Sequence, residues 1–170
     1  MQEPLLCKIP TREEMERQWN DKLAAAGEAG RQNCTAWKEE AIRNVLQGYS
    51  IPYYGFCNGQ IVCEATAMLH PGAVQNSEGL VGPGTAYLCA FRTIPAQQGK
   101  GYFSQLFRFM LADLQKRGYT KVTLGVEPQE VKNRQIYQHY GFTQFIKQAV
   151  ERWPDGTEIT VDYYAKPLQG

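Results

Sequence analysis

Apolar residues follow two periods along this chain, one typical of helices and one typical of strands. Thr11 and Glu14 have the spacing of a capping box, and apolar residues then recur at helical steps as far as Gly27 and Gly30. A second amphipathic segment spans residues 37–46 and ends at a glycine. The pattern predicts that the chain begins with two helices.

Strands are predicted where bulky, β-branched and aromatic residues gather between turn signals. An Asn58-Gly59 pair indicates a hairpin between the first two such segments, and Pro154-Asp155-Gly156 indicates a turn between the last two. Six glycine and proline positions make residues 71–84 a long loop. The predicted strands are residues 49–56, 61–69, 85–94, 121–126, 142–150 and 158–165.

Two further helices are predicted in the second half of the chain. Apolar residues recur at helical steps from Phe103 to Leu114, and the segment ends at Gly118. This helix joins the strands at 85–94 and 121–126, so the two strands are expected to run parallel. A shorter helix is predicted over residues 133–140.

The element order predicts an α/β fold of the α+β kind, in one domain over residues 1–170. We expect a mixed, mostly antiparallel sheet of about six to seven strands, with one parallel strand–helix–strand unit and about four flanking helices. The dinucleotide-binding glycine fingerprint is absent. Lys100 is followed by Gly101, so the chain also lacks a P-loop.

Composition narrows the function classes. Hydrophobic residues make up 43% and charged residues 21%, as in ordinary globular proteins, and the net charge is +1. Nucleic-acid and membrane partners are therefore not expected, and no apolar run is long enough to cross a bilayer. The N-terminus does not resemble a secretory signal. The five cysteines lack Cys-x-x-Cys spacing and there are two histidines, so we expect reduced thiols in a cytoplasmic protein and no metal.

The segment 98–104 is the strongest chemical signal. It reads Gln-Gly-Lys-Gly-Tyr-Phe-Ser and lies between a predicted strand and a predicted helix. A glycine-rich turn at this place directs backbone N–H groups outward at the positive end of the helix dipole, which favours a bound phosphate. The turn alone is equally explained as a tight connection, so a second motif decides its meaning.

That second motif is residues 133–142, Asn-Arg-Gln-Ile-Tyr-Gln-His-Tyr-Gly-Phe. The turn at 98–104 and this motif both lie where the predicted elements require them. Together they resemble the GNAT superfamily of N-acetyltransferases, which use acetyl-CoA. The first family motif, Arg/Gln-x-x-Gly-x-Gly/Ala, matches Gln98 to Phe103 except that Phe103 replaces the last small residue. Phe103 fits the apolar phase of its helix, so its side chain is expected to point into the core.

The resemblance implies roles for particular residues and makes acetyl-CoA the co-substrate. Tyr137 matches the position of the general acid, which would protonate the departing thiolate. Asn133, one turn earlier, is expected beside it at the cofactor. The backbone of Phe91, Arg92 and Thr93 matches the positions that pair with pantetheine, and a strand N–H there would polarise the thioester carbonyl. The expected pyrophosphate contacts are Gln98, Gly99, Lys100, Gly101, Tyr102, Phe103 and Ser104.

The base and the acceptor stay open at this point. Glu64 and Glu127 are candidate bases for an acceptor ammonium group, and a water chain is the alternative to both. The acceptor is expected to be the amine of a small molecule or a peptide, and a homodimer is left open. Five aromatic residues either line an acceptor pocket or belong to the core: Trp19, Trp37, Tyr49, Tyr53 and Tyr54. The loop 71–84 would cover such a pocket.

The function predicted from these residues is transfer of an acetyl group from acetyl-CoA to a primary amine, by direct attack in a ternary complex. Two alternatives from other classes remain. One is a non-catalytic acyl-CoA-binding or regulatory domain on the same fold, and the other is a nucleotide-binding module without acyl chemistry.

Overall fold

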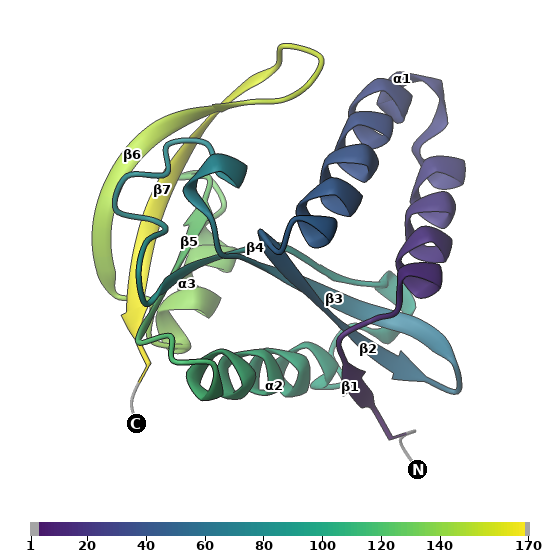
Figure 1. Cartoon of the computed structure of the whole chain (residues 1–170), viewed down its shortest axis with the longest axis horizontal. Helices are drawn as coiled ribbons and strands as arrows, with labels where there is room; N and C mark the ends of the chain where they lie inside the picture. The colour runs from purple at the N-terminus through teal and green to yellow at the C-terminus, as the bar shows by residue number, and fades with distance from the viewer. Residues whose placement is uncertain (1–3, 169–170) are drawn as a thin grey trace.

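The computed structural model describes residues 4–168, and these form one seven-stranded sheet with helices on both faces (Figure 1). The strand order is β1-β2-β3-β4-β5-β7-β6. The strands are β1 Leu6–Lys8, β2 Ser50–Cys57, β3 Gln60–Met68, β4 Thr85–Thr93, β5 Lys121–Val126, β6 Gln144–Arg152 and β7 Glu158–Pro167. The helices are α1 Arg12–Leu46, α2 Tyr102–Lys116 and α3 Val131–His139, with short 3₁₀ turns at Pro71–Ala73 and Pro95–Gln97.

The predicted fold class is confirmed, with two differences in the N-terminal part. The two expected helices form the single element α1, which is interrupted at Gly27, where φ is 68° and ψ is −173°. Only glycine adopts this backbone conformation readily, so the first helix ends at Gly27 as predicted, and the second follows it directly and begins well before residue 37. Strand β1 was not predicted, because a strand of three residues is too short to show a period.

The sheet is antiparallel except where β4 pairs with β5. That parallel pairing runs from Thr85 opposite Lys121 to Leu88 opposite Leu124, and then stops. Both strands continue beyond this point, so they separate at their carboxyl ends. Such a separation places a crevice in the middle of the sheet.

The main core lies between the sheet and α2. Leu106, Phe107, Met110 and Leu114 on α2 are completely or almost completely buried against β3, β4 and β5. These are the positions that the helical period predicted. Helix α1 packs over the opposite face (Figure 1). No helix among residues 4–168 is long and apolar enough to span a membrane.

Candidate active site

A β-bulge interrupts β4 next to the point where β4 and β5 separate. Cys89 pairs with Thr66 and Arg92 pairs with Glu64, so two residues of β4 lie opposite one residue of β3. Ala90 within the bulge has a φ of 58°, a left-handed conformation that is costly for a residue with a side chain. Bulges redirect backbone groups and often lie beside active sites. The end of β4 is thereby turned out of the regular ladder.

The glycine turn follows β4 and leads directly into α2. Gly99 and Gly101 both have left-handed backbones, with φ of 79° and 78°. The Gln105 amide donates to the Gly101 carbonyl at 3.1 Å, so the amides of Phe103 and Ser104 precede the regular bonds of the helix. These groups point outward at the positive end of α2, as an anion site requires.

A groove of about 680 Å³ lies over this turn. Its other wall is α3, which contributes the basic residue Lys132 as well as His139. Sequence reasoning missed both, because the pairing of α3 with the turn is a tertiary contact. The lining residues are Thr93, Gln97, Gln98, Gly99, Gly101, Tyr102, Phe103, Ser104, Lys132, Gln135, Ile136, His139 and Tyr140.

Phe103 packs its ring into the core below the turn. Its ring centroid lies 5.5 Å from that of Phe91 and 5.7 Å from that of Phe107. Phe103 is half-buried and also lines the groove. The large side chain at this motif position is thus packed against other aromatic rings at the base of the groove.

Tyr137 lies on α3, beside the end of β4. Its ring centroid is 5.6 Å from that of Phe91. Burial, with a smaller contribution from Glu130, raises the pKa of the Tyr137 phenol to about 12. The Tyr137 hydroxyl has no hydrogen bond within residues 4–168. Every fully buried side-chain oxygen in these residues has a hydrogen-bond partner, so the Tyr137 hydroxyl must contact solvent. Tyr137 is thus a protonated donor with a free hydroxyl.

Tyr137, Asn133 and Lys100 all lie outside the lining of the groove. The Asn133 side-chain amide is exposed and donates to the Glu130 carboxylate at 2.8 Å. The Lys100 ammonium donates to the Gln97 side chain at 2.9 Å. A direct cofactor contact by either side chain stays a prediction.

A second hollow of about 750 Å³ opens on the other face of the sheet, under α1. Phe91 and Arg92 line it, whereas Thr93 lines the groove, so consecutive residues at the end of β4 border the two hollows. Trp19, Trp37 and Tyr54 line the cavity as the pocket hypothesis predicted. The other lining residues are Met15, Lys22, Ala26, Gly30, Asn33, Cys34, Glu40, Ala41, Asn44, Val45, Ser50, Pro52, Glu64, Thr66, Met68, Cys89, Ala90 and Trp153.

Two predicted aromatic wall residues belong elsewhere. Tyr53 is completely buried in the α2 core, and its hydroxyl donates to Asp113 at 2.6 Å. Tyr49 stacks on His70, with ring centroids 3.9 Å apart. The loop 71–84 does not line the cavity either. Successive side chains of a strand point to opposite faces of the sheet. Tyr53 of β2 therefore lies in the core under α2, whereas Tyr54 lines the cavity under α1.

Glu64 lies at the floor of the cavity and is 5% exposed. The Gln18 amide donates to one carboxylate oxygen, and the Lys22 ammonium pairs with the other. Lys22 also lies over the Trp19 ring, 4.3 Å from its centroid. Both oxygens are occupied, so Glu64 forms part of a paired buried charge cluster.

Glu127 lies apart from both hollows. It follows β5, is partly exposed, and accepts a hydrogen bond from the Gln129 side chain at 3.0 Å. Glu127 lines neither the cavity nor the groove. The structure brings Glu64, and not Glu127, to the cavity under α1.

Comparisons with known proteins agree with this geometry. The family model described as acetyltransferase (GNAT) family matches residues 13–142. A search of curated proteins found no match. Among solved structures, an acetyltransferase of the GNAT family from Staphylococcus aureus Mu50 is 12% identical, with a TM-score of 0.69, and covers 98% of this chain and 100% of its own.

Two further structures share the fold. The ribosomal-protein-S18-alanine N-acetyltransferase of Escherichia coli is 14% identical, with a TM-score of 0.61, over 98% of this chain and 96% of its own. A protein from Salmonella typhimurium, solved with its cofactor acetyl-CoA, is 15% identical, with a TM-score of 0.65, over 97% of this chain and 94% of its own.

Proposed function

The chain belongs to the GNAT acetyltransferase family, and we propose that it transfers the acetyl group of acetyl-CoA to a primary amine by direct attack in a ternary complex. The position of the two hollows, both bordered by the end of β4, carries this proposal. A groove with outward backbone N–H groups lies on one side of the end of β4, and a separate cavity lies on the other side. Two substrates can therefore meet at the bulge without sharing a site.

The groove suits the anionic half of acetyl-CoA. The amides at the start of α2 and the ammonium group of Lys132 would receive its phosphates, since both favour negative charge. The Gln98 side chain donates to the Thr93 carbonyl at 3.3 Å and holds the turn against the strand. Pantetheine would follow residues 91–93 toward the cavity, as a strand added to an open edge.

The reaction joins the amine nitrogen to the acetyl carbonyl carbon and breaks the carbon–sulfur bond. The bulged backbone at Ala90 and Phe91 would donate a hydrogen bond to the carbonyl oxygen as negative charge develops there. Tyr137 would donate its phenolic hydrogen to the departing sulfur. The acceptor ammonium group would lose one proton to water before it attacks, and a second proton, lost after attack, would restore the Tyr137 hydroxyl. Glu64, whose oxygens accept hydrogen bonds from Gln18 and Lys22, is the alternative acceptor of the first proton.

The fold and the family are compatible with two classes of acceptor, a small molecule and a protein N-terminus. The structural neighbour from Escherichia coli acts on a ribosomal-protein alanine, but at 14% identity it shares the fold and not a demonstrated substrate. A single domain over residues 1–170, a cytoplasmic location and a homodimer stay predictions.

Thermal stability measured with acetyl-CoA, CoA and ATP tests the cofactor. We expect both CoA species to raise the melting temperature and ATP to have a smaller effect. Release of free CoA thiol in the presence of an amine panel then tests catalysis. Stabilisation without acetyl transfer to any amine would favour the alternative of an acyl-CoA-binding domain, and no stabilisation by either CoA species would contradict both.

A further inference from the structure

All three tryptophans of the chain line the cavity under α1. Trp19 and Trp37 come from the two halves of α1, on either side of the Gly27 kink, and Trp153 comes from the connection between β6 and β7. Met15 and Tyr54 add further apolar surface. Tryptophan offers the largest apolar contact area of any side chain, so this wall favours an aromatic or bulky apolar ligand.

The connection between β6 and β7 closes over one end of this cavity. The Trp153 ring meets the Trp37 ring edge-to-face, with centroids 5.6 Å apart. Asn33 and Asp155 bond reciprocally, with the Asn33 amide donating to the Asp155 carboxylate at 3.0 Å and the Asp155 backbone N–H donating back at 2.9 Å. These contacts form a bridge between α1 and the β6–β7 hairpin, which we term the roof.

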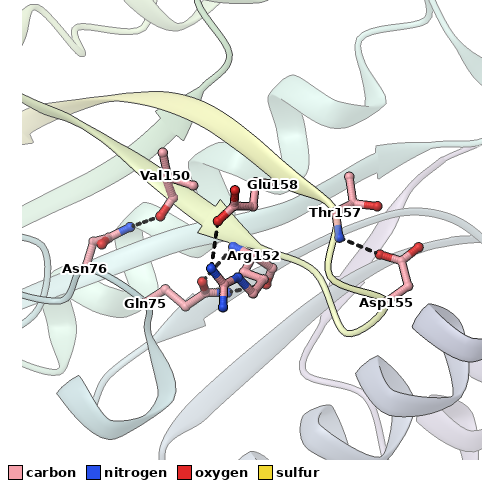
Figure 2. A network of polar contacts seen from close by, with 7 residues as sticks. All are labelled: Gln75, Asn76, Val150, Arg152, Asp155, Thr157 and Glu158. Atoms are coloured by element: carbon pink, nitrogen blue, oxygen red, sulfur yellow. Dashed lines mark hydrogen bonds and ion pairs between the residues drawn. The ribbon is translucent and has the colours of Figure 1, made fainter.

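The loop 71–84 also binds the hairpin, through hydrogen bonds to β6 (Figure 2). The Gln75 side chain bonds both the N–H and the carbonyl of Arg152, at 2.8 Å and 2.9 Å. The Asn76 amide donates to the Val150 carbonyl at 2.9 Å. The loop expected to cover the pocket therefore supports the roof and does not form it.

Two carboxylates line the cavity, and they differ in their partners. Glu64 is paired with Lys22, as described above. Glu40 has no ion pair or side-chain hydrogen bond within the described part of the chain. It lies three residues after Trp37 on the cavity face of α1. Burial, Glu151 and Glu40 together raise the pKa of the Cys89 thiol to about 12, which agrees with a position of Glu40 facing the bulged end of β4.

We infer that the acceptor is a small primary amine carried on an aromatic body, whose ammonium group pairs with Glu40 while its ring packs among Trp19, Trp37 and Trp153. The inference rests on the proposed function and names the substrate class of the same site. The volume of about 750 Å³ is that of a small-molecule pocket, and the roof ties α1 to the hairpin at one end of it.

Binding can be measured without turnover, because every tryptophan of the chain lies in this cavity. Tryptophan fluorescence is titrated with 2-phenylethylamine in the presence of CoA. We expect a saturable change, weakened about tenfold or more when the neutral 2-phenylethanol replaces the amine. Glu40→Gln should weaken amine binding similarly, whereas the exposed neighbour Glu39→Gln should leave it within about twofold. Equal binding of amine and alcohol would overturn the role of Glu40.

Acceptor choice is tested by release of CoA thiol with 2-phenylethylamine, with spermidine and with a short peptide that begins with alanine. We expect the aromatic amine to react at least about tenfold faster than either other acceptor. The double variant Asn33→Ala, Trp153→Ala, which opens the roof, should narrow the difference from the peptide. Faster reaction of the wild-type protein with the peptide would overturn this inference but leave acetyl transfer intact. Saturable amine binding without any CoA release would contradict only the proposed function.

Discussion

The ring of Tyr137 on α3 lies 5.6 Å from the ring of Phe91 on β4, centroid to centroid. Phe91 also contacts Phe103, at 5.5 Å, and lines the cavity under α1. One aromatic cluster thus joins the candidate acid, the glycine turn and the acceptor side. Because the cluster is packed on both sides, the distance of Tyr137 from the bulge is fixed by the core and not by a flexible loop.

Tyr137→Phe removes the hydroxyl and keeps the packed ring. We expect kcat to fall about 100-fold or more, because the departing sulfur loses its hydrogen donor. The KM for acetyl-CoA and the melting temperature should change little. Steady-state kinetics and thermal unfolding measure both effects. Tyr164→Phe, in a half-buried tyrosine that packs on Phe145 outside both hollows, is the matched control, and an equal loss of activity there would argue against a specific role.

Gly101→Ala tests the turn that precedes α2. The added methyl group meets nothing within 4 Å, but the φ of 78° makes a side chain costly by about 1–2 kcal/mol. Relief of that strain would move the N–H groups of the turn, so we expect the Kd for CoA to rise about tenfold in calorimetric titration.

Gly59→Ala is the control for that substitution. Gly59 has a φ of 76°, equal open space and no place in the groove. We expect it to lower the melting temperature as much as Gly101→Ala does and to leave CoA binding unchanged. A parallel loss of CoA affinity would mean that general destabilisation, and not the turn, causes the effect.

Glu64→Gln distinguishes a chemical role of the cavity floor from a structural one. The change leaves the buried Lys22 ammonium without its counter-charge, so we expect a lower free energy of unfolding, by about 3 kcal/mol. Addition of Lys22→Met should restore most of that stability. Acetylation that recovers together with stability indicates a structural role, whereas acetylation that stays low indicates that Glu64 acts on the amine.

Glu127→Gln is expected to keep kcat and the KM for the amine within about twofold of wild type. The carboxylate contacts Gln129 and lines neither hollow. Changes of exposed surface charges generally have small effects. A large fall in kcat would return Glu127 to the list of candidate bases.

Acid should destabilise the protein through Asp113. Partial burial opposes its ionisation, but hydrogen bonds from the Tyr53 hydroxyl and from Arg117 outweigh burial and lower the pKa of the Asp113 carboxyl. A carboxyl with a lowered pKa in the folded state stabilises the fold at pH values above its ordinary pKa of about 4. That stabilisation is lost as the pH falls through the lower folded value.

Asp113→Asn should therefore reduce the stability at pH 7 and flatten its decline below about pH 4. Tyr53→Phe removes the hydroxyl that donates at 2.6 Å and should have a similar, smaller effect. Urea unfolding between about pH 7 and pH 3 measures both variants. An unchanged acid slope in Asp113→Asn would show that other carboxyl groups control the decline.

The predicted elements that were confirmed are those with a local physical cause. The Asn58-Gly59 hairpin, the apolar face of α2 and the parallel β4–α2–β5 unit all follow from backbone preferences and periodic burial. The turn at 98–104 was predicted on the same basis, but its interpretation as an anion site needed the second motif at 133–142. The family resemblance then supplied the expectation for Tyr137.

The sequence by itself determined most of the order of the elements, the glycine turn before α2 and the family, because these depend on residues close together along the chain. Only the tertiary structure decided the acceptor side. Asn33 contacts Asp155, and Trp37 contacts Trp153, although more than a hundred residues separate the partners in the sequence. The ion pair of Glu64 with Lys22 joins α1 to β3. Such contacts depend on how the kinked α1 packs over the sheet, and no local spacing of residues specifies that packing.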